Sequence, residues 1–399
     1  MGLATILEAV ADLEDGKPII IVDDEDRENE GDLCVPAQLV TPQHVAFMSR
    51  HGGGLICTAM LASRLDELQI EPMVNHNTSR YGTAFSVSVE AKDLVTTGIS
   101  AHDRAATIRH LINPDAKPWD FAKPGHTFPL RAAEGGVLKR AGQTEAAVDL
   151  TRLAGLYPAG VICEVMNDDG TMARLPELER FSAAHGVKIV TIKDLISYRR
   201  RNEKLVGCAV ISPNIPIGDR VWAAHAYEDF ITHDVHIALV MGTVDQSWPT
   251  LVRVHSCCLT GDVFGSLRCD CGPQLRSAMD AIAAAGHGVI LYLGNQEGRG
   301  IGIIDKLRAY NLQDQGLDTV EANEALDQPA DSRDYGIGYQ ILYDLGIRKM
   351  RILTNNPRKL IGIEGYGLEV VEQLPIQIVP NPYNERYLRT KKEKLGHNL

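Results

Sequence analysis

The chain has 399 residues, with 40 Lys plus Arg against 52 Asp plus Glu and a formal net charge of −12. Apolar residues make up 44% and charged residues 23%, values that are typical of a folded globular protein and exclude a disordered or fibrous one. The acidic balance argues against a general nucleic-acid-binding protein, and no apolar run reaches the ~20 residues needed to span a membrane.

The N-terminus has no basic segment followed by an apolar stretch, so no secretory signal is visible. Four of the eight cysteines (Cys257, Cys258, Cys269 and Cys271) fall within fifteen residues, and the others are scattered. This distribution indicates a metal site in a reducing compartment rather than a disulfide framework. We therefore expect a soluble, cytoplasmic protein with no membrane partner.

The first predicted element is a helix over residues 6–13, whose apolar side chains recur at helical spacing, and Gly16 is placed to end it. Residues 18–22 form a short β-branched apolar run that predicts a buried strand. Further along, the pattern predicts a helix over 177–185 and then a strand over 187–192. Alternating strands and helices indicate a mixed domain.

A further helix opens at Asp194 and ends in the basic, polar run 198–204. We place the domain boundary there, which gives a first domain over 1–202 and a second over 203–399. The second half again alternates predicted strands (206–211, 237–241, 289–293 and 350–353) with predicted helices (275–282 and 337–345). The predicted fold class is α/β or α+β, with two consecutive mixed domains, each a sheet packed with helices.

The acidic run 23–32 directly follows the strand predicted over 18–22. A charge run is usually a solvated surface, but loops at the ends of strands build active sites in α/β folds, so we weigh the two interpretations about equally. Carboxylates at such a position suit Mg²⁺, which prefers oxygen ligands and shares its coordination shell with substrate. Arg27 inside the run would hold a phosphate group or an acidic neighbour.

Five segments of the first half carry a resemblance to a known family: VDDEDRENEGD (22–32), NTSRYGTAF (77–85), TTGISAHDR (96–104), PGHTFPLRA (124–132) and GVICEVMNDDGTMAR (160–174). In this order they are similar to 3,4-dihydroxy-2-butanone 4-phosphate synthase of riboflavin biosynthesis, over about residues 1–200. The resemblance implies conversion of ribulose 5-phosphate to 3,4-dihydroxy-2-butanone 4-phosphate and formate, with Mg²⁺ or Mn²⁺.

The same resemblance implies roles for individual residues. It places Glu164 and His126 at the reacting carbons and makes Glu28 and Gln143 the metal ligands. The substrate-binding positions that it implies are Arg27, Glu28, Asp32, Arg140, Ala141, Gly142, Gln143, Thr144 and Glu164. The chain departs from the family at Gln143, where the family motif has a metal-binding His in a run such as R-x-G-H-T-E. A Gln amide oxygen can bind Mg²⁺, but the side chain has no imidazole with which to move a proton.

The cysteine cluster of the second half also predicts chemistry. Cys258, Cys269 and Cys271, with no evident fourth His, predict zinc with an open coordination position, which is the catalytic arrangement. The alternatives are a structural four-cysteine site that includes Cys257, and redox-active or inert cysteines. The glycine-rich segment 296–302 follows a predicted strand and suits phosphate binding, although it could also be a plain turn.

Six segments of the second half are similar to GTP cyclohydrolase II, over about residues 205–399: RVHSCCLTGDVFGSLRCDCG (253–272), QEGRGIG (296–302), LQDQGLDTVEAN (312–323), ADSRDYGIG (330–338), LTNNPRK (353–359) and NERYLRTKKEKLGH (384–397). The resemblance implies hydrolysis of GTP to 2,5-diamino-6-(5-phospho-ribosylamino)pyrimidin-4-one, with release of formate and diphosphate. Zinc on the three cysteines would activate the water that attacks the purine C8, and Mg²⁺ would accompany the triphosphate.

This second resemblance implies Arg333 as the nucleophile on the α-phosphate, Asp331 as its proton acceptor and Tyr310 as an active-site tyrosine. Because a guanidinium stays protonated in water, charge stabilisation by Arg333 is the alternative role. The implied GTP-binding positions are Arg253, Val254, His255, Ser256, Cys257, Gln274, Glu297, Gly298, Arg299, Thr319, Thr354 and Lys359. The chain departs from the family at Cys257, where Glu is usual, and at Gly294-Asn295, where many members have an Arg.

The two halves in this order resemble the bifunctional family that begins both branches of riboflavin biosynthesis, which implies a homodimer with small-molecule substrates. One alternative is that only the cyclohydrolase half is active and the first half, with Gln143, is a scaffold or regulatory module. Another is a non-catalytic regulator that binds nucleotide and sugar phosphate. Formate release, measured separately with GTP and with ribulose 5-phosphate, discriminates among the three.

Overall fold

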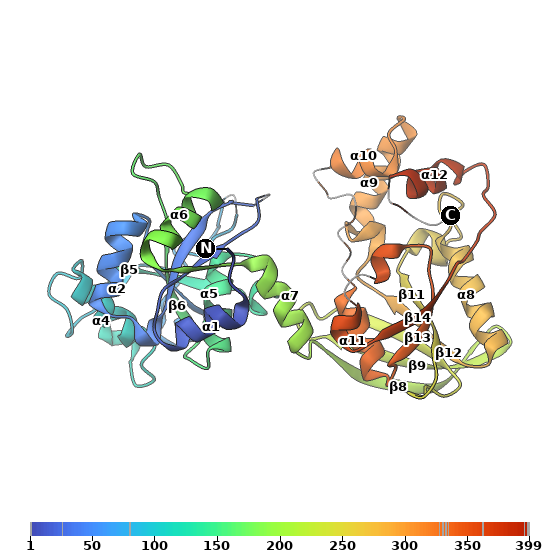
Figure 1. Cartoon of the computed structure of the whole chain (residues 1–399), viewed down its shortest axis with the longest axis horizontal. Helices are drawn as coiled ribbons and strands as arrows, with labels where there is room; N and C mark the ends of the chain where they lie inside the picture. Colours follow the sequence, from blue (N-terminus) through green and yellow to red (C-terminus); the bar gives the residue numbers. More distant parts are fainter. Residues whose placement is uncertain are drawn as a thin grey trace. The chain divides into compact units, whose positions relative to one another are not determined.

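The structure, a computed structural model, describes residues 2–25, 27–79, 81–326, 328, 331, 333, 335–360, 363–394 and 396. Its contacts divide the chain into two compact units, Met1–Arg199 and Arg200–Leu399. Each unit is built around one seven-stranded sheet with helices on it, as Figure 1 shows. Among the described residues, no helix has both the length and the apolar character needed to cross a membrane.

The sheet of the first unit is mixed, in the order β4-β5-β3-β6-β2-β1-β7. Its strands are β1 (Ile19–Val22), β2 (Gly31–Pro36), β3 (Cys57–Leu61), β4 (Val89–Ala91), β5 (Phe121–Ala132), β6 (Ala159–Glu164) and β7 (Lys188–Thr191). β1 pairs antiparallel with β2 and parallel with β7, and all four of its residues are buried. Burial on both faces explains why this strand is continuously apolar instead of alternating.

Helices cover both faces of this sheet. They are α1 (Ile6–Glu14), α2 (Pro42–Phe47), α3 (Ala62–Glu67), α4 (Ala101–Leu111), α5 (Gln143–Leu153), α6 (Leu175–His185) and α7 (Ile192–Asn202). α1 and α5 pack with Ile19 and Ile21 into one hydrophobic cluster, whereas α4 and α6 pack with Ile20 and Val22 into the other. The side chains of β1 alternate between the two clusters, as the period of two along a strand requires.

The sheet of the second unit has the order β14-β13-β11-β12-β10-β9-β8. Its strands are β8 (Val206–Ile217), β9 (Arg220–Asp229), β10 (Val235–Met241), β11 (Thr250–Ser256), β12 (Gly288–Leu293), β13 (Lys349–Leu353) and β14 (Glu369–Leu374). β11 pairs parallel with β12 and β13, while β10 pairs antiparallel with β9 and β12. Loops after the parallel strands therefore leave the same edge of the sheet.

The helices of this unit are α8 (Cys271–Ala285), α9 (Gly302–Asp314), α10 (Thr319–Glu324), α11 (Gly336–Asp344) and α12 (Glu385–Glu393). α11 packs Ile341 and Leu342 into one cluster of the core, and α8 packs Ala278 and Ile282 into the other. The two helices cover opposite faces of the parallel strands. α9, α10 and α12 lie together in Figure 1, apart from these faces.

The predicted mixed fold is confirmed in both units. The strand predicted over 18–22 is β1, the helix predicted over 177–185 is part of α6, and the helix predicted over 275–282 is part of α8. No element is predicted between residues 36 and 174, a stretch that holds α2 to α5 and β3 to β6. The strands β3, β5 and β6 divide their apolar residues between the two clusters, so they lack the apolar–polar alternation of a half-buried strand.

The division between the units falls inside α7, and the boundary expected near residue 203 lies at the end of this helix. Arg199 is buried and donates from Nη1 to Asp149 Oδ2 at 2.6 Å and to the Gly135 carbonyl at 2.8 Å. Gln340, from α11, donates from Nε2 to the carbonyls of Arg200 and Glu203. Each side of the division is thus bonded within its own unit.

Candidate active sites

In the first unit, three side-chain oxygens converge on one nitrogen of Arg27. Its Nη1 lies 2.7 Å from Asp23 Oδ2, 2.9 Å from Glu28 Oε2 and 2.8 Å from Gln143 Oε1. Asp23, Arg27 and Glu28 belong to the loop between β1 and β2, and Gln143 is the first residue of α5. The predicted ligands Glu28 and Gln143 therefore lie together, with the guanidinium between their oxygens. Asp26 of the acidic run lies outside the described residues.

Asp32 and Glu164 form a second part of this site. They are register partners on β2 and β6, and the Glu164 carboxylate accepts a hydrogen bond from Leu55 N at 2.8 Å. Burial, followed by the neighbouring charges of Glu164 and Glu28, raises the pKa of Asp32 well above its ordinary value. Burial also raises the pKa of Glu30. Two adjacent carboxyl groups in a buried place can exchange a proton with a bound substrate.

The start of α5 brings further cationic character to the site. Arg140 contacts both oxygens of buried Glu145 at 3.1 and 3.2 Å and donates from Nη2 to the Tyr81 carbonyl. A Cβ at Gly142 would lie 3.3 Å from Arg27 Nη2 and 3.7 Å from Arg140 Cζ, so this glycine separates the two guanidinium groups. A helix N-terminus flanked by two arginines suits a phosphate group. Of the neighbouring predicted positions, Thr144 is buried and Ala141 is exposed.

His126 is the predicted residue that the structure does not bring into this cluster. It lies on β5, and its Nδ1 is 2.7 Å from Glu90 Oε2. Among the described residues of the first unit, the ion-pair partner of His126 is Glu90, and neither Glu28 nor Glu164 contacts it. Contacts within one chain therefore join Arg27, Glu28 and Gln143, and strand pairing joins Asp32 to Glu164, whereas His126 is paired with Glu90.

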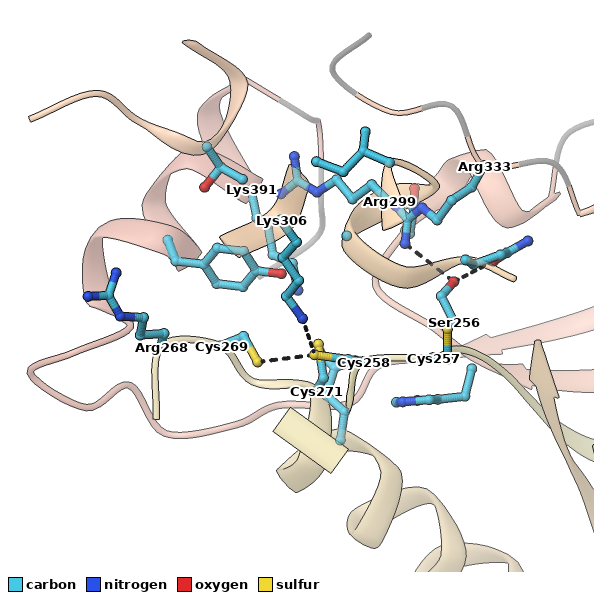
Figure 2. Close-up of a pocket in the computed structure, with 18 of the residues that line it drawn as sticks. Ser256, Cys257, Cys258, Arg268, Cys269, Cys271, Arg299, Lys306, Arg333 and Lys391 are labelled. Atoms are coloured by element: carbon cyan, nitrogen blue, oxygen red, sulfur yellow. Dashed lines mark hydrogen bonds between the residues drawn. The ribbon is translucent and has the colours of Figure 1, made fainter. Parts of the chain in front are cut away.

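The second unit contains a strongly cationic cavity at the edge of its sheet where β11 and β12 end. In a chain of net charge −12, its described lining has no carboxylate side chain and seven cations: Arg253, Arg268, Arg299, Lys306, Arg333, Lys359 and Lys391. Cys258, Cys269 and Cys271 line the same cavity, as Figure 2 shows. Such a lining favours a polyanionic ligand beside the cysteines.

The three predicted zinc ligands are brought together. The sulfur atoms of Cys258, Cys269 and Cys271 all lie within 4.8 Å of one another, and Cys258 Sγ is 3.7 Å from Cys269 Sγ. A Cβ at Gly261 would lie 2.7 Å from Cys269 Sγ, so only glycine leaves the sulfur atoms room there. Hydrogen bonds from Cys269 and Cys271, with the Lys306 ammonium, lower the pKa of Cys258 far below its ordinary value. Three close cysteine sulfurs, of which Cys258 is the one held as a thiolate, are the kind of ligand set that suits a soft metal ion such as zinc.

Cys257 is not part of this cluster, although it precedes Cys258. Its Sγ donates to the Gly294 carbonyl at 3.2 Å, and burial raises the pKa of its thiol to about 11. The group of close metal-binding side chains found among the described residues contains Cys258, Cys269 and Cys271 alone. This geometry favours the three-cysteine arrangement over the four-cysteine alternative.

Lys306 is a site residue that the sequence analysis does not identify. Its Nζ lies 3.1 Å from Cys258 Sγ, 2.9 Å from Thr260 Oγ1 and 2.5 Å from Glu297 Oε1. Burial opposes its charge, but the hydrogen bond to Glu297 and the Cys258 thiolate raise the pKa of Lys306 above its ordinary value. Tyr310, one helical turn later on α9, lies 3.3 Å from Thr260 Oγ1 through its hydroxyl. The signal in the sequence that could have identified Lys306 is its position four residues before Tyr310, which puts both side chains on one face of the helix that follows the glycine-rich motif.

The predicted pair Asp331 and Arg333 forms a two-pronged ion pair, of which Arg333 is the member that lines the cavity. Arg333 Nε lies 2.8 Å from Asp331 Oδ1, and Nη2 lies 2.6 Å from Oδ2. Arg333 Nη1 also donates to Ser256 Oγ at 3.4 Å. Burial opposes its charge, but Asp331 raises the pKa of Arg333 above its ordinary value. In this arrangement Arg333 is a fixed cation.

Two of the predicted GTP-binding cations are buried without a hydrogen bond to any described carboxylate. Arg253 donates to the Leu353 carbonyl at 2.9 Å and to Gln274 Oε1 at 2.6 Å, and its Nε has no partner in the described part of the unit. Lys359 donates to the Val254 carbonyl at 2.6 Å. Burial, then the charges of Arg253 and Arg333, lowers the pKa of Lys359. Buried cations in this state are stabilised by an anionic ligand.

The remaining predicted GTP positions lie around the same cavity. Gly298 and Arg299 have positive φ values of 61° and 68°, which turn the segment after β12 tightly. His255 Nε2 lies 3.0 Å from Asp262 Oδ2, at hydrogen-bond distance. The buried Nδ1 of the same ring has no partner among the described groups. The cavity lining includes Ser256, Cys257, Gln274, Gly298, Thr319 and Thr354, whereas Val254 points into the core. Lining residues beyond the predicted site positions include Arg268, Lys306, Asn323, Tyr387 and Lys391.

Comparison with known proteins agrees with both geometries. The family model of 3,4-dihydroxy-2-butanone 4-phosphate synthase matches residues 7–198, and that of GTP cyclohydrolase II matches residues 210–375. The riboflavin biosynthesis protein RibBA of Aquifex aeolicus (strain VF5) is 58% identical over 98% of this chain and 97% of its own length. RibBA of Salinispora arenicola (strain CNS-205) is 55% identical over 99% of this chain and 94% of its own.

A solved structure is also similar over most of the chain. The two-domain 3,4-dihydroxy-2-butanone 4-phosphate synthase RibBX from A. baumannii is 38% identical, with a TM-score of 0.71, and the match covers 93% of this chain and 99% of that one. Both units of the present chain are enzymatic, and the scaffold and regulator alternatives have no support from these comparisons. The chain belongs to the RibBA family of bifunctional riboflavin biosynthesis proteins, with a 3,4-dihydroxy-2-butanone 4-phosphate synthase unit followed by a GTP cyclohydrolase II unit.

Proposed function

We propose that the cavity of the second unit binds GTP, with zinc held by Cys258, Cys269 and Cys271. The observation that carries this proposal is the meeting of three close sulfurs with seven cationic and no carboxylate side chains in the described lining. A nucleoside triphosphate needs compensation for several negative charges, which this lining supplies. When bound, zinc supplies Lewis-acid chemistry for the hydrolytic release of formate.

The chain's own residues then divide the remaining tasks. Lys306, held between Glu297 and Thr260, keeps a proton close to the cysteine cluster. Arg333, fixed by Asp331, stabilises negative charge at the α-phosphate when diphosphate leaves, and we favour this role over nucleophilic attack because its guanidinium is held as a cation. Arg253 and Lys359 bind phosphate oxygens, with Mg²⁺ accompanying the triphosphate. His255, which lines the cavity and whose buried Nδ1 has no partner among the described groups, hydrogen-bonds the base in this proposal.

For the first unit, we propose ribulose 5-phosphate as the substrate. Arg27 and Arg140, on either side of Gly142, bind its phosphate. Asp32 and Glu164 transfer protons at the sugar carbons, since enediol formation needs a base beside the bound substrate. Gln143 Nε2 is buried with no hydrogen-bond partner among the described residues and can donate to a substrate oxygen.

We also propose that Glu28 and Gln143 hold Mg²⁺, or Mn²⁺ in its place. Their oxygens are the hard donors that such ions prefer, and both lie within 2.9 Å of one atom, Arg27 Nη1, so they can share one centre. The ion fits only if Arg27 moves aside. When bound, it supplies charge stabilisation of the developing enediolate. A homodimer and a cytoplasmic location remain our expectations for the whole chain, and the mass of the protein in solution tests the dimer.

Formate release tests both halves of the proposal. We expect the purified chain to release formate from GTP with zinc bound, and from ribulose 5-phosphate with added Mg²⁺. The two reactions are assayed in separate vessels, and zinc is measured by atomic absorption. Formate release from GTP by protein stripped of zinc would contradict the proposed metal centre, and no formate from ribulose 5-phosphate at any Mg²⁺ concentration would contradict the proposed first site.

A further inference from the structure

The C-terminal helix α12 lies outside the segment matched by the GTP cyclohydrolase II family model, which ends at residue 375. Nevertheless, two of its side chains, Tyr387 and Lys391, line the nucleotide cavity. The spacing of four residues places them on one face of the helix. The Lys391 ammonium lies 4.7 Å from the centre of the Tyr387 ring, and the Arg299 guanidinium lies 5.9 Å from it.

Lys391 reaches the segment that carries the cysteines. Its Nζ lies 2.7 Å from Oδ1 of Asp270, the residue between Cys269 and Cys271, and both side chains are buried. Figure 2 places Lys391 on the side of the cavity opposite the strand that leads to Ser256. Removing one partner of such a buried pair would leave the other charge buried and uncompensated, which is strongly destabilising.

From Asp270, further hydrogen bonds lead to the nucleotide positions. Gln274 Nε2 donates to Asp270 Oδ2 at 2.6 Å, and Gln274 Oε1 accepts from Arg253 Nη2 at 2.6 Å. Gln274 and Arg253 both line the cavity. The contact made by Lys391 is thus the first of a series of buried bonds, each of which fixes the orientation of the next side chain.

The same helix is bonded to the other wall of the cavity. Lys394, directly after α12, contacts Asp318 and lies 2.9 Å from Glu321 Oε1, and Arg386 Nη2 donates to the Gly316 carbonyl at 2.5 Å. These groups hold α12 beside α10, whose Thr319 and Asn323 line the cavity. α12 therefore joins the cysteine segment to α10.

We propose that α12 is part of the nucleotide site, with Lys391 as a positioning residue that orients Asp270 and Gln274, and Tyr387 as a wall against which the bound nucleoside triphosphate rests. This inference rests on the proposed function of the cavity. Lys391 acts through Asp270, so its removal is expected to disturb nucleotide binding even where the protein stays folded.

The test compares Lys391→Met with Lys392→Met in the full-length chain. Lys392 is the next residue of the same helix and is exposed, so its substitution removes the same charge without touching the cavity. Binding of a non-hydrolysable GTP analogue is measured by calorimetry. We expect Lys391→Met to raise the Kd by at least ~10-fold, with Lys392→Met within about 2-fold of the unaltered chain. Equal Kd values for the two variants would overturn the inference.

The double variant Asp270→Asn with Lys391→Met separates positioning from simple charge balance. It removes the unpaired buried carboxylate, so the stability of the second unit should recover toward that of the unaltered chain. If Lys391 positions Gln274, analogue binding stays weak in the double variant, and Lys391→Arg, which keeps the cation, restores most of it. Recovery of affinity together with stability in the double variant would contradict positioning.

Two control measurements distinguish a failure of this inference from a failure of the proposed function. The unaltered chain must bind the analogue and release formate from GTP, because otherwise the cavity assignment itself is wrong. Formate release from ribulose 5-phosphate, which belongs to the first unit, should be the same in every variant. Affinity lost only with Lys391 supports the inference.

Discussion

Arg27 and Gln143 meet through a 2.8 Å hydrogen bond from Nη1 to Oε1, although they are 116 positions apart in the sequence. The bond uses the one Gln143 atom that could bind a hard metal ion, and the same Nη1 also lies 2.9 Å from Glu28 Oε2. The guanidinium thus takes the central position between the two oxygens. A divalent cation entering this site must displace a cation that the chain itself provides.

We expect Gln143→His to raise both the Mg²⁺ affinity of the first unit and its rate of formate release from ribulose 5-phosphate, the rate by at least ~10-fold. The substitution removes Gln143 Oε1, which accepts the hydrogen bond from Arg27 Nη1. The new imidazole can bind the ion and move a proton near neutral pH. Calorimetric Mg²⁺ titration and the formate assay measure the two effects, with formate release from GTP as the control. Equal affinity and rate in the two proteins would show that Gln143 is a working ligand.

Cys269→Ser should abolish zinc binding and formate release from GTP while leaving the reaction of the first unit unchanged. A hydroxyl is a much poorer ligand than a thiolate, and two cysteines cannot complete the proposed site.

Gly261→Ala should also lower the zinc affinity, because the new methyl group would lie 2.7 Å from Cys269 Sγ and 3.1 Å from Cys258 Sγ. Zinc content by atomic absorption is the measurement, and about one zinc ion per unaltered chain is expected. Full GTP turnover by zinc-free Cys269→Ser protein would contradict the assignment.

Cys257→Glu is expected to lower the KM for GTP. Cys257 lines the cavity and offers a weak sulfur acceptor, whereas a carboxylate there could accept hydrogen bonds from a guanine edge. Hydrogen bonds to charged groups change binding by about 1.5–3 kcal/mol, so a roughly 10-fold decrease in KM is expected if ground state and transition state gain equally. Steady-state kinetics with GTP provide the measurement. An unchanged KM would place the base away from this side chain.

Asp32→Asn should stabilise the first unit at pH 8 but not near pH 4. Burial raises the pKa of Asp32 above its ordinary value of 3.8. A carboxyl with a raised folded-state pKa contributes stability below the unfolded pKa and loses it as the pH rises through the folded pKa. We expect a gain of about 0.5–2 kcal/mol at pH 8 together with loss of formate release from ribulose 5-phosphate, since active-site groups commonly oppose stability.

Urea unfolding of Asp32→Asn and of the unaltered chain at pH 8 and pH 4 measures whether the free energy of unfolding rises at the higher pH alone. Asp169 is a matched control, because hydrogen bonds from Thr171 hold its pKa below the ordinary value, so Asp169→Asn should bring no gain at pH 8. A gain from Asp32→Asn that is equally large at pH 4 would mean that charge burial is not its cause.

The parts of the sites that could be predicted are those whose residues lie close together in the sequence. Cys258, Cys269 and Cys271 fall within fourteen residues, so their spacing alone points to one metal ion, and the continuous apolar run of β1 identifies a buried strand. Lys391 could not be predicted from its surroundings, because it stands in a run of exposed charges and meets Asp270 121 positions away. For Arg27, an acidic partner is predicted from the acidic run itself, but its contact with Gln143 is not, because that contact depends on where α5 begins relative to β1.

The basic segment Arg199-Arg200-Arg201 offers three consecutive cleavage points to a trypsin-like protease. In the folded chain it forms part of α7, with Arg199 buried against Asp149 and the carbonyl of Arg200 bonded to Gln340. Proteolysis requires an extended, accessible backbone, so cutting here must wait for the last turn of the helix to open. Resistance of these three arginines to limited digestion therefore reports how firmly the last turn of α7 is closed, and so how well the polypeptide that links the two catalysts is protected at this point.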